Sequence, residues 1–477
     1  MTTTITSQMI NDIAQSGLPA GNGVRKKVVI VGAGMAGLVA AYELLRAGHE
    51  PLLLEARQRV GGRIETLRAP FSHGLYAEAG AMRVPRVHQL TLAYCRHFGL
   101  KLTPFTMTNP RGYLYFAGKR HRAADVNANP ELLPFDLAPH ERGKSAGQLW
   151  RKAIGEIEEA LTTQGEAAWT KLAEEFDHFS TREFLEFKGW SEGAIEMYGL
   201  MADQEALMNS SFLELLREDV GGFYSDMQEL AGGMDTLPNA FMPKLGAYIR
   251  FGAKMIAIDQ TPEEVIIHYD TVAGRFTARG DYAIITVPFP ILRHVEVIKP
   301  FSRAKQRAIR QLHYDASAKV LLQARRRFWE EDDGIYGGGT TSDLPVRATY
   351  YPDHGQETGR GVLLASYTWG EDAQRWGSLA AYDRIEQAIE NLALIHPQIR
   401  SEFEAGASKM WHDDEFAGGA FAFFNPGQQT LLHEAIIAPE GRIYFAGEHA
   451  SLSHAWIQGA IESGLHAALE IHTNGEW

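Results

Sequence analysis

Glycines and one acidic residue near the start of the chain stand at spacings that could hold a phosphate-rich ligand. The segment VVIVGAGMAGL places Gly32, Gly34 and Gly37 in a GxGxxG pattern between an apolar run and a helix-forming run. Such a pattern combines a tight bend, a close approach of backbone to a pyrophosphate, and close packing of helix on strand. Glu55 ends the next apolar run, PLLLE, where a carboxylate can accept ribose hydroxyls. We predict a bound dinucleotide, with an ordinary glycine turn as the alternative.

An arginine directly follows a small-residue turn in the segment EAGAMRVP. Arg83 cannot lose its proton, so if it faces inward it needs an anion from the protein or from a ligand. A structural salt bridge to Glu78 would satisfy it from within the chain, and a ligand carboxylate would satisfy it from outside. The residues alone leave both readings open.

A lysine stands inside the apolar run SAKVLLQA. Burying Lys319 without a partner is costly, which makes it a candidate functional residue. The alternative is an edge lysine whose long side chain reaches solvent from an apolar strand.

Composition and charge exclude several classes of protein. The 477 residues hold 46 Lys and Arg against 59 Asp and Glu, a net charge of −13, whereas nucleic-acid binding needs clustered positive charge. A single cysteine, Cys95, excludes an intrachain disulfide and a cysteine-based zinc site, and we predict no bound metal. No run reaches the roughly 18 apolar residues of a membrane helix, and MTTTITSQMINDIAQSGLPAG lacks the features of a secretion signal. We therefore expect a soluble, cytoplasmic protein.

Three kinds of segment must position these residues. From Lys27 to about Arg63, two apolar runs around a glycine turn and a helix-forming run predict a βαβ unit. Residues from about 134 to 230 are rich in helix formers, and Ser180 with Glu183 has the spacing of a helix-capping box. Much of the remainder alternates strand-like runs with turns, namely YIRFGAKMIAI, DYAIITVP, SAKVLLQA, GVLLASYTW and RIYFAG. We expect one α/β domain to be assembled from distant segments, with a helical insert.

Two further motifs complete a specific set. RQRVGGR supplies a second glycine turn and a cation soon after Glu55, and GRIYFAGEHA sets Gly447 and Glu448 after a strand. Together with GAMR, SAKV and the closing GEHASLSHAWIQGAIESG, they resemble the FAD-dependent amine oxidase family, and within it the L-amino-acid oxidases. The resemblance extends from about Lys27 to the C-terminus.

The resemblance implies an α/β fold with a Rossmann-like FAD-binding domain of discontinuous segments, a mixed-sheet substrate domain and a helical insert. We expect a flexible N-terminal arm at 1–24 and the FAD-binding domain at 25–65, 231–300 and 435–477. The substrate-binding domain is expected at 66–133 and 301–434, and the helical domain at 134–230.

The resemblance also implies where FAD lies. Glu55 would hold the adenosine ribose, Arg63 would lie near the phosphates, and the backbone of Met255 would meet the adenine. The cysteine that tethers FAD in monoamine oxidases is absent, so we expect FAD to bind noncovalently. The expected cofactor-binding residues are Gly32, Gly34, Gly37, Glu55, Ala56, Arg57, Gly62, Arg63, Gly80, Ala81, Met82, Arg83, Met255, Gly447, Glu448, Trp456 and Ile457.

Four residues would act on the substrate by the same resemblance. Arg83 would pair with the carboxylate of an amino acid, supported by the hydroxyl of Tyr367. Lys319 would hold a water against flavin N5 and take part in oxygen reactivity. Trp456, at the start of a helix, would form the aromatic wall beside the substrate α-carbon.

The expected pocket is aromatic and roomy. Ala420 in FAGGAFAFF is small and leaves room for a large substrate side chain, and Trp369 in SYTWGED adds an aromatic wall. We therefore expect aromatic or large apolar L-amino acids as substrates. A histidine that some family members carry in the helical domain has no match in ELLREDVGGFY, so its role does not carry over.

The implied reaction is oxidative deamination of L-α-amino acids by oxygen, to 2-oxo acids, ammonia and hydrogen peroxide. The resemblance also implies a homodimer. Three alternatives stay open. The chain could oxidise amines without a carboxylate, it could be a non-catalytic flavin-binding scaffold, or it could be a dehydrogenase that passes electrons to a quinone.

Overall fold

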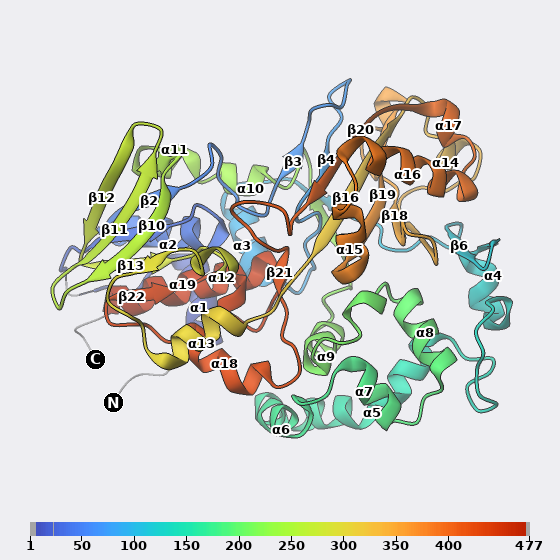
Figure 1. Ribbon diagram of the computed structural model, residues 1–477, viewed down its shortest axis with the longest axis horizontal. Helices are drawn as coiled ribbons and strands as arrows, with labels where there is room; N and C mark the ends of the chain where they lie inside the picture. Colours follow the sequence, from blue (N-terminus) through green and yellow to red (C-terminus); the bar gives the residue numbers. More distant parts are fainter. Residues whose placement is uncertain (1–5, 22, 474–477) are drawn as a thin grey trace.

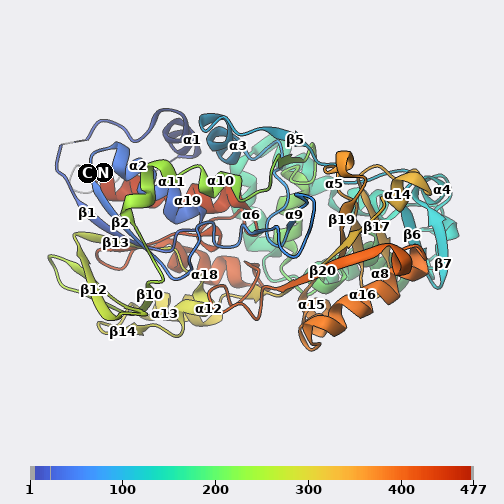
Figure 2. The same cartoon turned by 90° about the horizontal axis from the view of Figure 1, so that it is seen from above.

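The computed structural model of the chain describes residues 6–21 and 23–473. Two sheet-containing parts lie next to each other along the long axis of the molecule, and a group of helices lies below one of them (Figure 1). The view from above separates the same two parts (Figure 2). No helix in the described part of the chain is long and apolar enough to cross a membrane.

A five-stranded parallel sheet carries the predicted βαβ unit. Its order is β22-β13-β1-β2-β9, and every neighbouring pair runs parallel. Helices α2 (Met35–Arg46) and α19 (Ile457–Thr473) share an apolar core with residues of this sheet. The strands are β1 Lys27–Val31, β2 Glu50–Glu55, β9 Ile249–Phe251, β13 Tyr282–Ile285 and β22 Ile443–Phe445. Distant parts of the sequence thus meet in one sheet, as expected.

A second, mostly antiparallel sheet packs on the parallel one, with the order β12-β11-β10-β14. Val29 and Ile285 of the parallel sheet share a buried core with Ile258 and Ile267 of this second sheet. The strands are β10 Lys254–Gln260, β11 Val265–Thr271, β12 Gly274–Gly280 and β14 Glu296–Val297.

Two helices extend this core beyond the expected domain boundaries. Ala308 of α13 (Arg303–Gln311) and Leu432 of α18 (Gln428–Ile437) are buried in the same apolar cluster as the two sheets. The boundaries expected at 300/301 and 434/435 therefore fall inside one core, because the apolar faces of these helices pack toward the parallel sheet.

A seven-stranded mixed sheet forms the other sheet-containing part, with the order β20-β16-β19-β18-β17-β6-β7. Its strands β16 and β19 are the predicted runs SAKVLLQA and GVLLASYTW, and β16 is paired on both sides, by β19 and by β20, which was not predicted. The strands are β6 Tyr113–Phe116, β7 Lys119–Arg122, β16 Ser317–Ala324, β17 Gly339–Ser342, β18 Ala348–Tyr350, β19 Gly361–Trp369 and β20 Phe403–Met410. Its helices are α14 Phe328–Glu331, α15 Gly370–Gly377, α16 Ala381–Ile395 and α17 Ile399–Glu402.

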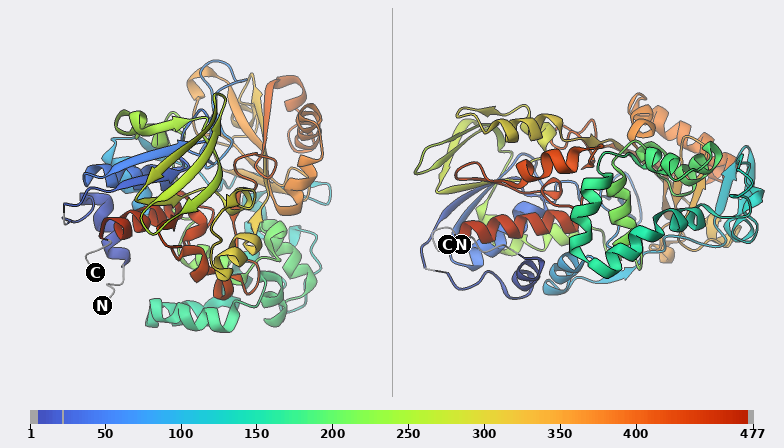
Figure 3. Two further views of the ribbon diagram at one scale, coloured as in Figure 1. Left: turned by 60° about the vertical axis from the view of Figure 1, so that its left-hand side comes forward. Right: turned by 90° about the horizontal axis from the view of Figure 1, so that it is seen from below.

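The helical insert has a core of its own. Phe184 and Phe212 stack face to face in it, with ring centroids 3.7 Å apart. The predicted capping box is present, since the side chain of Ser180 accepts from the backbone of Glu183 and Glu183 accepts from the backbone of Ser180. The helices are α5 Ala146–Gln164, α6 Glu166–Phe176, α7 Thr181–Phe187, α8 Glu192–Met201 and α9 Phe212–Val220 (Figure 3).

The remaining elements are short or connect the parts. They are β3 Thr66–Leu67, β4 Ala77–Glu78, α3 Gln89–His97, β5 Leu102–Pro104, α4 Ala123–Ala128, β8 Gln228–Leu230, α10 Thr236–Asn239, α11 Met242–Leu245, α12 Phe289–Leu292, β15 Tyr314–Asp315 and β21 Phe421–Ala422, with 3₁₀ turns at Pro130–Leu132, Glu205–Leu207, Gly246–Tyr248, Gln356–Thr358 and Glu448–Ala450.

The expected flexible arm at 1–24 is a docked segment where it is described. Residues Ser7–Ser16 form helix α1, which Thr6 caps by accepting a hydrogen bond from the backbone of Met9. Ile10 and Ile13 are buried in the core that holds α2 and α19. The prediction of a flexible arm was wrong here because these apolar residues recur at helical spacing and form an apolar face.

We predict that Ile13→Ala lowers the free energy of unfolding by about 2–4 kcal/mol, because it leaves a cavity in this core. Urea unfolding of the flavin-free protein measures the change. Gln15→Ala, at an exposed position of the same helix, is the control and is expected to have little effect. Equal stability of both variants would mean that α1 does not contribute to the fold.

Candidate functional site

The three glycines of the GxGxxG turn meet three different steric demands. Gly32 has φ of +106°, and a Cβ there would lie 2.4 Å from the hydroxyl of Thr286. A Cβ at Gly37 would lie 2.0 Å from the carbonyl oxygen of Gly32, so α2 packs directly on the turn. A Cβ at Gly34 would meet no atom within 4 Å. Helix α2 begins there without a side-chain cap, so its first N–H groups remain available to a phosphate.

The carboxylate of Glu55 is fixed by two backbone donors at the end of β2. Its Oε2 accepts from the N–H of Ala33 at 2.7 Å and its Oε1 from the N–H of Arg57 at 2.8 Å. Burial raises the pKa of Glu55, and these two hydrogen bonds oppose that rise. Each carboxylate oxygen has a further lone pair, so Glu55 can still accept hydroxyl donors from a ligand.

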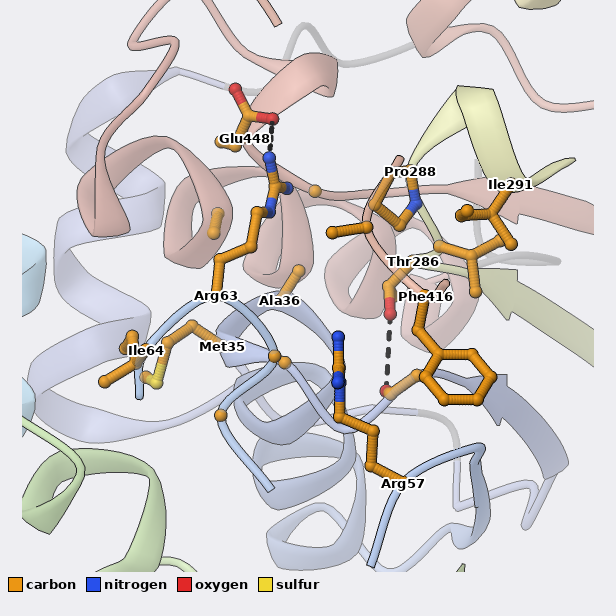
Figure 4. A pocket seen from close by; sticks show the side chains of 18 of the residues that line it. Met35, Ala36, Arg57, Arg63, Ile64, Thr286, Pro288, Ile291, Phe416 and Glu448 are labelled. Carbon is orange, nitrogen blue, oxygen red and sulfur yellow. Dashed lines mark hydrogen bonds and ion pairs between the residues drawn. The ribbon is translucent and has the colours of Figure 1, made fainter. Parts of the chain in front are cut away.

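A single cavity of about 380 Å³ brings most of the predicted residues together (Figure 4). It extends from the glycine turn and β2 to the mixed sheet, so residues of both sheet-containing parts line it. The predicted residues that line it are Gly32, Gly34, Glu55, Ala56, Arg57, Gly62, Arg63, Gly80, Ala81, Met255, Lys319, Tyr367, Ala420, Gly447, Glu448, Trp456 and Ile457.

Four predicted residues do not line this cavity. Gly37 lies behind the turn, where it packs α2 on β1. Met82 is buried in an apolar cluster with Leu321 of β16, so its side chain packs as core. Arg83 lies among aromatic residues described below, and Trp369 lines a smaller neighbouring cavity.

Arg63 and Glu448 form an ion pair in the wall of the cavity (Figure 4). Nη1 of Arg63 donates to Oε1 of Glu448 at 2.7 Å and to the carbonyl of Ala420 at 2.9 Å. Burial alone would raise the pKa of Glu448, but Arg63 and the neighbouring histidines outweigh burial and lower the pKa. Arg63 therefore has a partner within the protein while its side chain lines the cavity.

Lys319 is buried on β16, the second strand of the mixed sheet. Its side chain is 1% exposed, and strands pair with β16 on both sides, which excludes an edge lysine that reaches solvent. Nζ donates to the carbonyls of Gly80 at 2.6 Å and Glu78 at 3.2 Å, and lies 4.5 Å from the centre of the Tyr367 ring. Burial lowers the pKa of Lys319, although Glu78 opposes the shift.

Arg83 has no acidic partner within ion-pair distance among the described residues. Its Nη1 contacts the sulfur of Met107 at 3.0 Å and the hydroxyl of Tyr350 at 3.4 Å. Its guanidinium lies 5.6–6.0 Å from the rings of Phe105, Tyr224 and Tyr350.

The salt bridge to Glu78 that the sequence allowed is not formed. The carboxylate of Glu78 accepts instead from the hydroxyl of Thr66 at 2.8 Å and the backbone N–H of Met234 at 2.9 Å. Arg83 is thus a guanidinium in an aromatic setting without a carboxylate in ion-pair contact, although Asp203 and Glu218 lie near enough for Arg83 to lower their pKa values.

Aromatic rings lie both near Arg83 and along the cavity. Tyr367 and Trp369 lie on β19 with ring centroids 4.4 Å apart. Trp456 directly precedes α19, and its ring meets that of His88 edge to face at 5.0 Å. The pocket region is therefore aromatic, as the sequence indicates.

Several lining residues were not predicted. Thr286, Val287, Pro288, Ile291 and His294 follow β13 and line the cavity. The signal was present, because a parallel strand next to β1 delivers its carboxyl end to the same edge of the sheet. Trp411 and Phe416, in the loop after β20, also line it, and no local motif marks them.

We predict opposite outcomes for two neighbouring glycines. Gly37→Ala is expected to lower the free energy of unfolding by about 1–3 kcal/mol even without cofactor, because the new methyl group collides with the Gly32 carbonyl. Gly34→Ala is expected to fold with a change within about 1 kcal/mol but to bind the predicted cofactor, FAD, more weakly, since its methyl group enters open space at the turn. Urea unfolding and a fluorescence titration with FAD measure both effects. Unchanged FAD affinity of Gly34→Ala would contradict the assignment of this turn.

Comparison with known proteins connects this site to a family. A family model described as "Flavin containing amine oxidoreductase" matches residues 35–472. The YobN protein of Bacillus subtilis (strain 168) is 40% identical over 456 residues, covering 94% of this chain and 95% of that protein. The L-amino-acid oxidase of Vipera ammodytes ammodytes is 36% identical over 472 residues, covering 98% of this chain and 96% of that protein.

Two solved structures share the fold. A putrescine oxidase variant with a redesigned cofactor site has a TM-score of 0.75 at 23% identity, covering 94% of this chain and 99% of that one. The cyclohexylamine oxidase of Brevibacterium oxydans IH-35A has a TM-score of 0.76 at 18% identity, covering 95% of this chain and all of that one. Since the family model and the relatives span nearly the whole sequence, this chain belongs to the flavin-containing amine oxidoreductases.

Proposed function

We propose that this protein is an FAD-dependent L-amino-acid oxidase. The observation that carries the proposal is Arg83, a cation in an aromatic setting near Tyr367 that has no carboxylate in ion-pair contact among the described residues. A planar guanidinium suits a two-point bond to a carboxylate, which an amino acid supplies and a simple amine does not. The full-length relative from Vipera ammodytes ammodytes, named as an L-amino-acid oxidase, supports the same activity.

FAD fits the residues of the cavity. Gly34 leaves open space at the start of α2, and Glu55 at the end of β2 keeps lone pairs for hydroxyl donors. We propose that FAD binds noncovalently, because the chain has one cysteine and Cys95 is buried in α3, away from the cavity lining. Burial raises the pKa of its thiol to about 11, which disfavours the reactive thiolate.

The reaction consumes an L-amino acid, oxygen and water and yields a 2-oxo acid, ammonia and hydrogen peroxide. When bound, FAD would supply the two-electron redox chemistry between the amino acid and oxygen. The protein orients the substrate, with Arg83 and Tyr367 holding the carboxylate and Trp456 bounding the α-carbon.

Lys319 is proposed to assist the reaction with oxygen. A protonated Nζ has three N–H groups, and two of them donate to the carbonyls of Glu78 and Gly80, while the side chain lines the cavity. The third N–H group is therefore available to a water molecule.

The aromatic pocket favours aromatic or large apolar substrates. Tyr367 and Trp456 line the cavity together with Phe421, and Ala420 beside them is small. A homodimer and a cytoplasmic location remain predictions from the sequence.

Oxidation of amines without a carboxylate is the second candidate, since the two structural neighbours are named as putrescine and cyclohexylamine oxidases. Arg83 favours the amino acid, because a bound amine would leave that guanidinium unpaired. In a scaffold without turnover, the yellow colour of the flavin would not bleach when an amino acid is added in the absence of oxygen. An enzyme that passes electrons to a quinone would form no peroxide.

We predict that the enzyme oxidises L-phenylalanine and discriminates against phenethylamine by about 10⁴ in kcat/KM. The two compounds share the ring, the amine and the reacting carbon, and differ in the carboxylate that Arg83 would bind. A peroxide assay measures both rates. Arg83→Ala is expected to remove most of the discrimination by slowing the amino acid, and Arg83→Lys is expected to restore little, because a point charge cannot copy a two-pronged bond.

Arg86→Ala is the matched control, since Arg86 is exposed and its nearest acidic partner, Asp226, lies 3.9 Å away on the surface. It is expected to leave the discrimination unchanged. Similar rates for the amine and the amino acid in the unmutated enzyme would replace this function with that of an amine oxidase.

We also predict that Lys319→Met slows the oxygen-dependent half of turnover more than the half that consumes the amino acid. Stopped-flow absorption of the flavin measures the two halves separately. Lys305→Met is the control, because Lys305 is equally buried but donates to the carbonyl of Ile436 outside the cavity. If the loss in Lys319→Met falls only on the amino acid half, Lys319 acts on the substrate and not on oxygen.

A further inference from the structure

Helix α9 of the helical insert presents two buried carboxylates to the loop that precedes α19. Glu214 and Glu218 are separated by four positions, which places them one above the other on the same helical face. Their residues are 2% and 7% exposed. Buried acids on one face require partners, and the loop at 453–456 supplies them.

The upper contact joins Glu214 to His454. Oε1 of Glu214 lies 2.7 Å from Nδ1 of His454 and also accepts from the backbone N–H of Phe424 at 3.0 Å. Burial alone would lower the pKa of His454, but Glu214 raises it, so the contact favours the protonated imidazole.

The lower contact joins Glu218 to Trp456. Oε1 of Glu218 accepts from the indole N–H of Trp456 at 2.6 Å, and Oε2 accepts from the hydroxyl of Tyr224 at 2.5 Å. An indole has one N–H, so this bond selects a single orientation of the ring within its pocket. The ring of Tyr224 lies 6.0 Å from the Trp456 ring and 6.0 Å from the Arg83 guanidinium. Glu218 therefore connects the aromatic wall with the surroundings of Arg83.

The backbone of Ala455, between His454 and Trp456, is strained and needs the support of these two contacts. Ala455 has φ of +65°, a left-handed backbone conformation that an alanine rarely adopts. Its N–H donates to Oε2 of Glu448 at 3.1 Å. With His454 and Trp456 held on either side, the strained turn carries the indole from the start of α19 into the cavity lining.

We propose that Glu218 is a positioning residue of the oxidation site, which acts through Trp456 and sets the orientation of the aromatic wall, while Glu214 and His454 anchor the same loop. The helical insert thereby completes the substrate pocket. This inference rests on the proposed function for its kinetic readout, and a binding measurement tests it independently of turnover.

The decisive variants are Glu218→Ala and Glu218→Gln. Alanine removes both acceptors, whereas glutamine keeps an acceptor oxygen for Trp456 and an amide that can donate to the Tyr224 oxygen. We expect Glu218→Ala to lower kcat/KM for L-phenylalanine by roughly ten- to hundredfold, as misplaced substrate contacts do, and Glu218→Gln to stay within about threefold of wild type. A loss in Glu218→Gln as large as in Glu218→Ala would overturn the positioning role in favour of one for the charge itself.

The chain offers a matched control at the next position. Oδ2 of Asp219 accepts from the indole N–H of Trp150 at 2.9 Å, and Trp150 stacks on Tyr198 inside the helical core. Asp219→Ala therefore removes a similar bond from the same helix without touching the pocket. It is expected to leave kcat/KM of the FAD-loaded enzyme unchanged. A loss equal to that of Glu218→Ala would show that damage to the insert explains both.

Coupling to Trp456 tests the route. If Glu218 acts through the indole, Trp456→Phe and the double variant with Glu218→Ala have the same kcat/KM, whereas multiplied losses would overturn the proposal. Should Glu218→Ala not fold, Trp456→Phe breaks the same bond from the other side, and wild-type kcat/KM in that variant would also overturn it.

Calorimetric titration with benzoate, which presents a carboxylate and a ring but cannot be oxidised, gives the readout without turnover. We expect its dissociation constant to rise about tenfold in Glu218→Ala and to stay near wild type in Glu218→Gln and Asp219→Ala. A wild-type enzyme that binds benzoate but oxidises no amino acid would refute the proposed function alone. Unchanged benzoate affinity in Glu218→Ala would refute the positioning role alone.

Discussion

The geometry of the site depends most on the hydrogen bonds that the carboxylate of Glu448 accepts. It receives the guanidinium of Arg63 at 2.7 Å, the backbone N–H of Ala422 at 3.2 Å and that of Ala455 at 3.1 Å. These donors come from the loop after β2, from β21 and from the turn before α19, which are far apart in the sequence. One buried charge with three donors from separate segments fixes their mutual positions, because leaving any donor unpaired at this depth would be costly.

Unlike Arg63, the cations Lys319 and Arg83 have no carboxylate in ion-pair contact among the described residues. Lys319 donates to two carbonyls, and Arg83 contacts a sulfur, a hydroxyl and aromatic faces. Burial correspondingly raises the pKa of Asp203 and of Glu218 to about 7, with Arg83 opposing the rise in both. An arrangement of this kind leaves electrostatic capacity for an anionic ligand, which a set of closed salt bridges would have consumed.

What could be predicted from the sequence follows from how local each signal is. The glycine turn and Glu55 lie within one βαβ unit, so spacing alone places them at one sheet edge. Lys319 was a candidate because a charge within an apolar strand is unusual whatever its partners. Glu218 could not be placed, since its role depends on a loop more than 230 positions away that only the tertiary fold brings to α9. Helix α1 was not predicted although its signal is local, because a short apolar stripe was interpreted as part of a flexible arm. Its partners α2 and α19 were both correctly expected to be helices.

The last segment of the chain has consequences for how the protein is made. Strand β22 joins the edge of the parallel sheet beside β13, α19 packs in the core with α2, and Lys26 donates to the carbonyls of Ile471 and His472 at 2.5 and 3.0 Å. The glycine turn at Gly32 precedes these partners by more than 400 positions in the sequence. The nascent chain must therefore keep the face of its first βαβ unit uncovered until α19 has been synthesised, and the lining of the cavity, which includes Gly447 and Trp456, is complete only then.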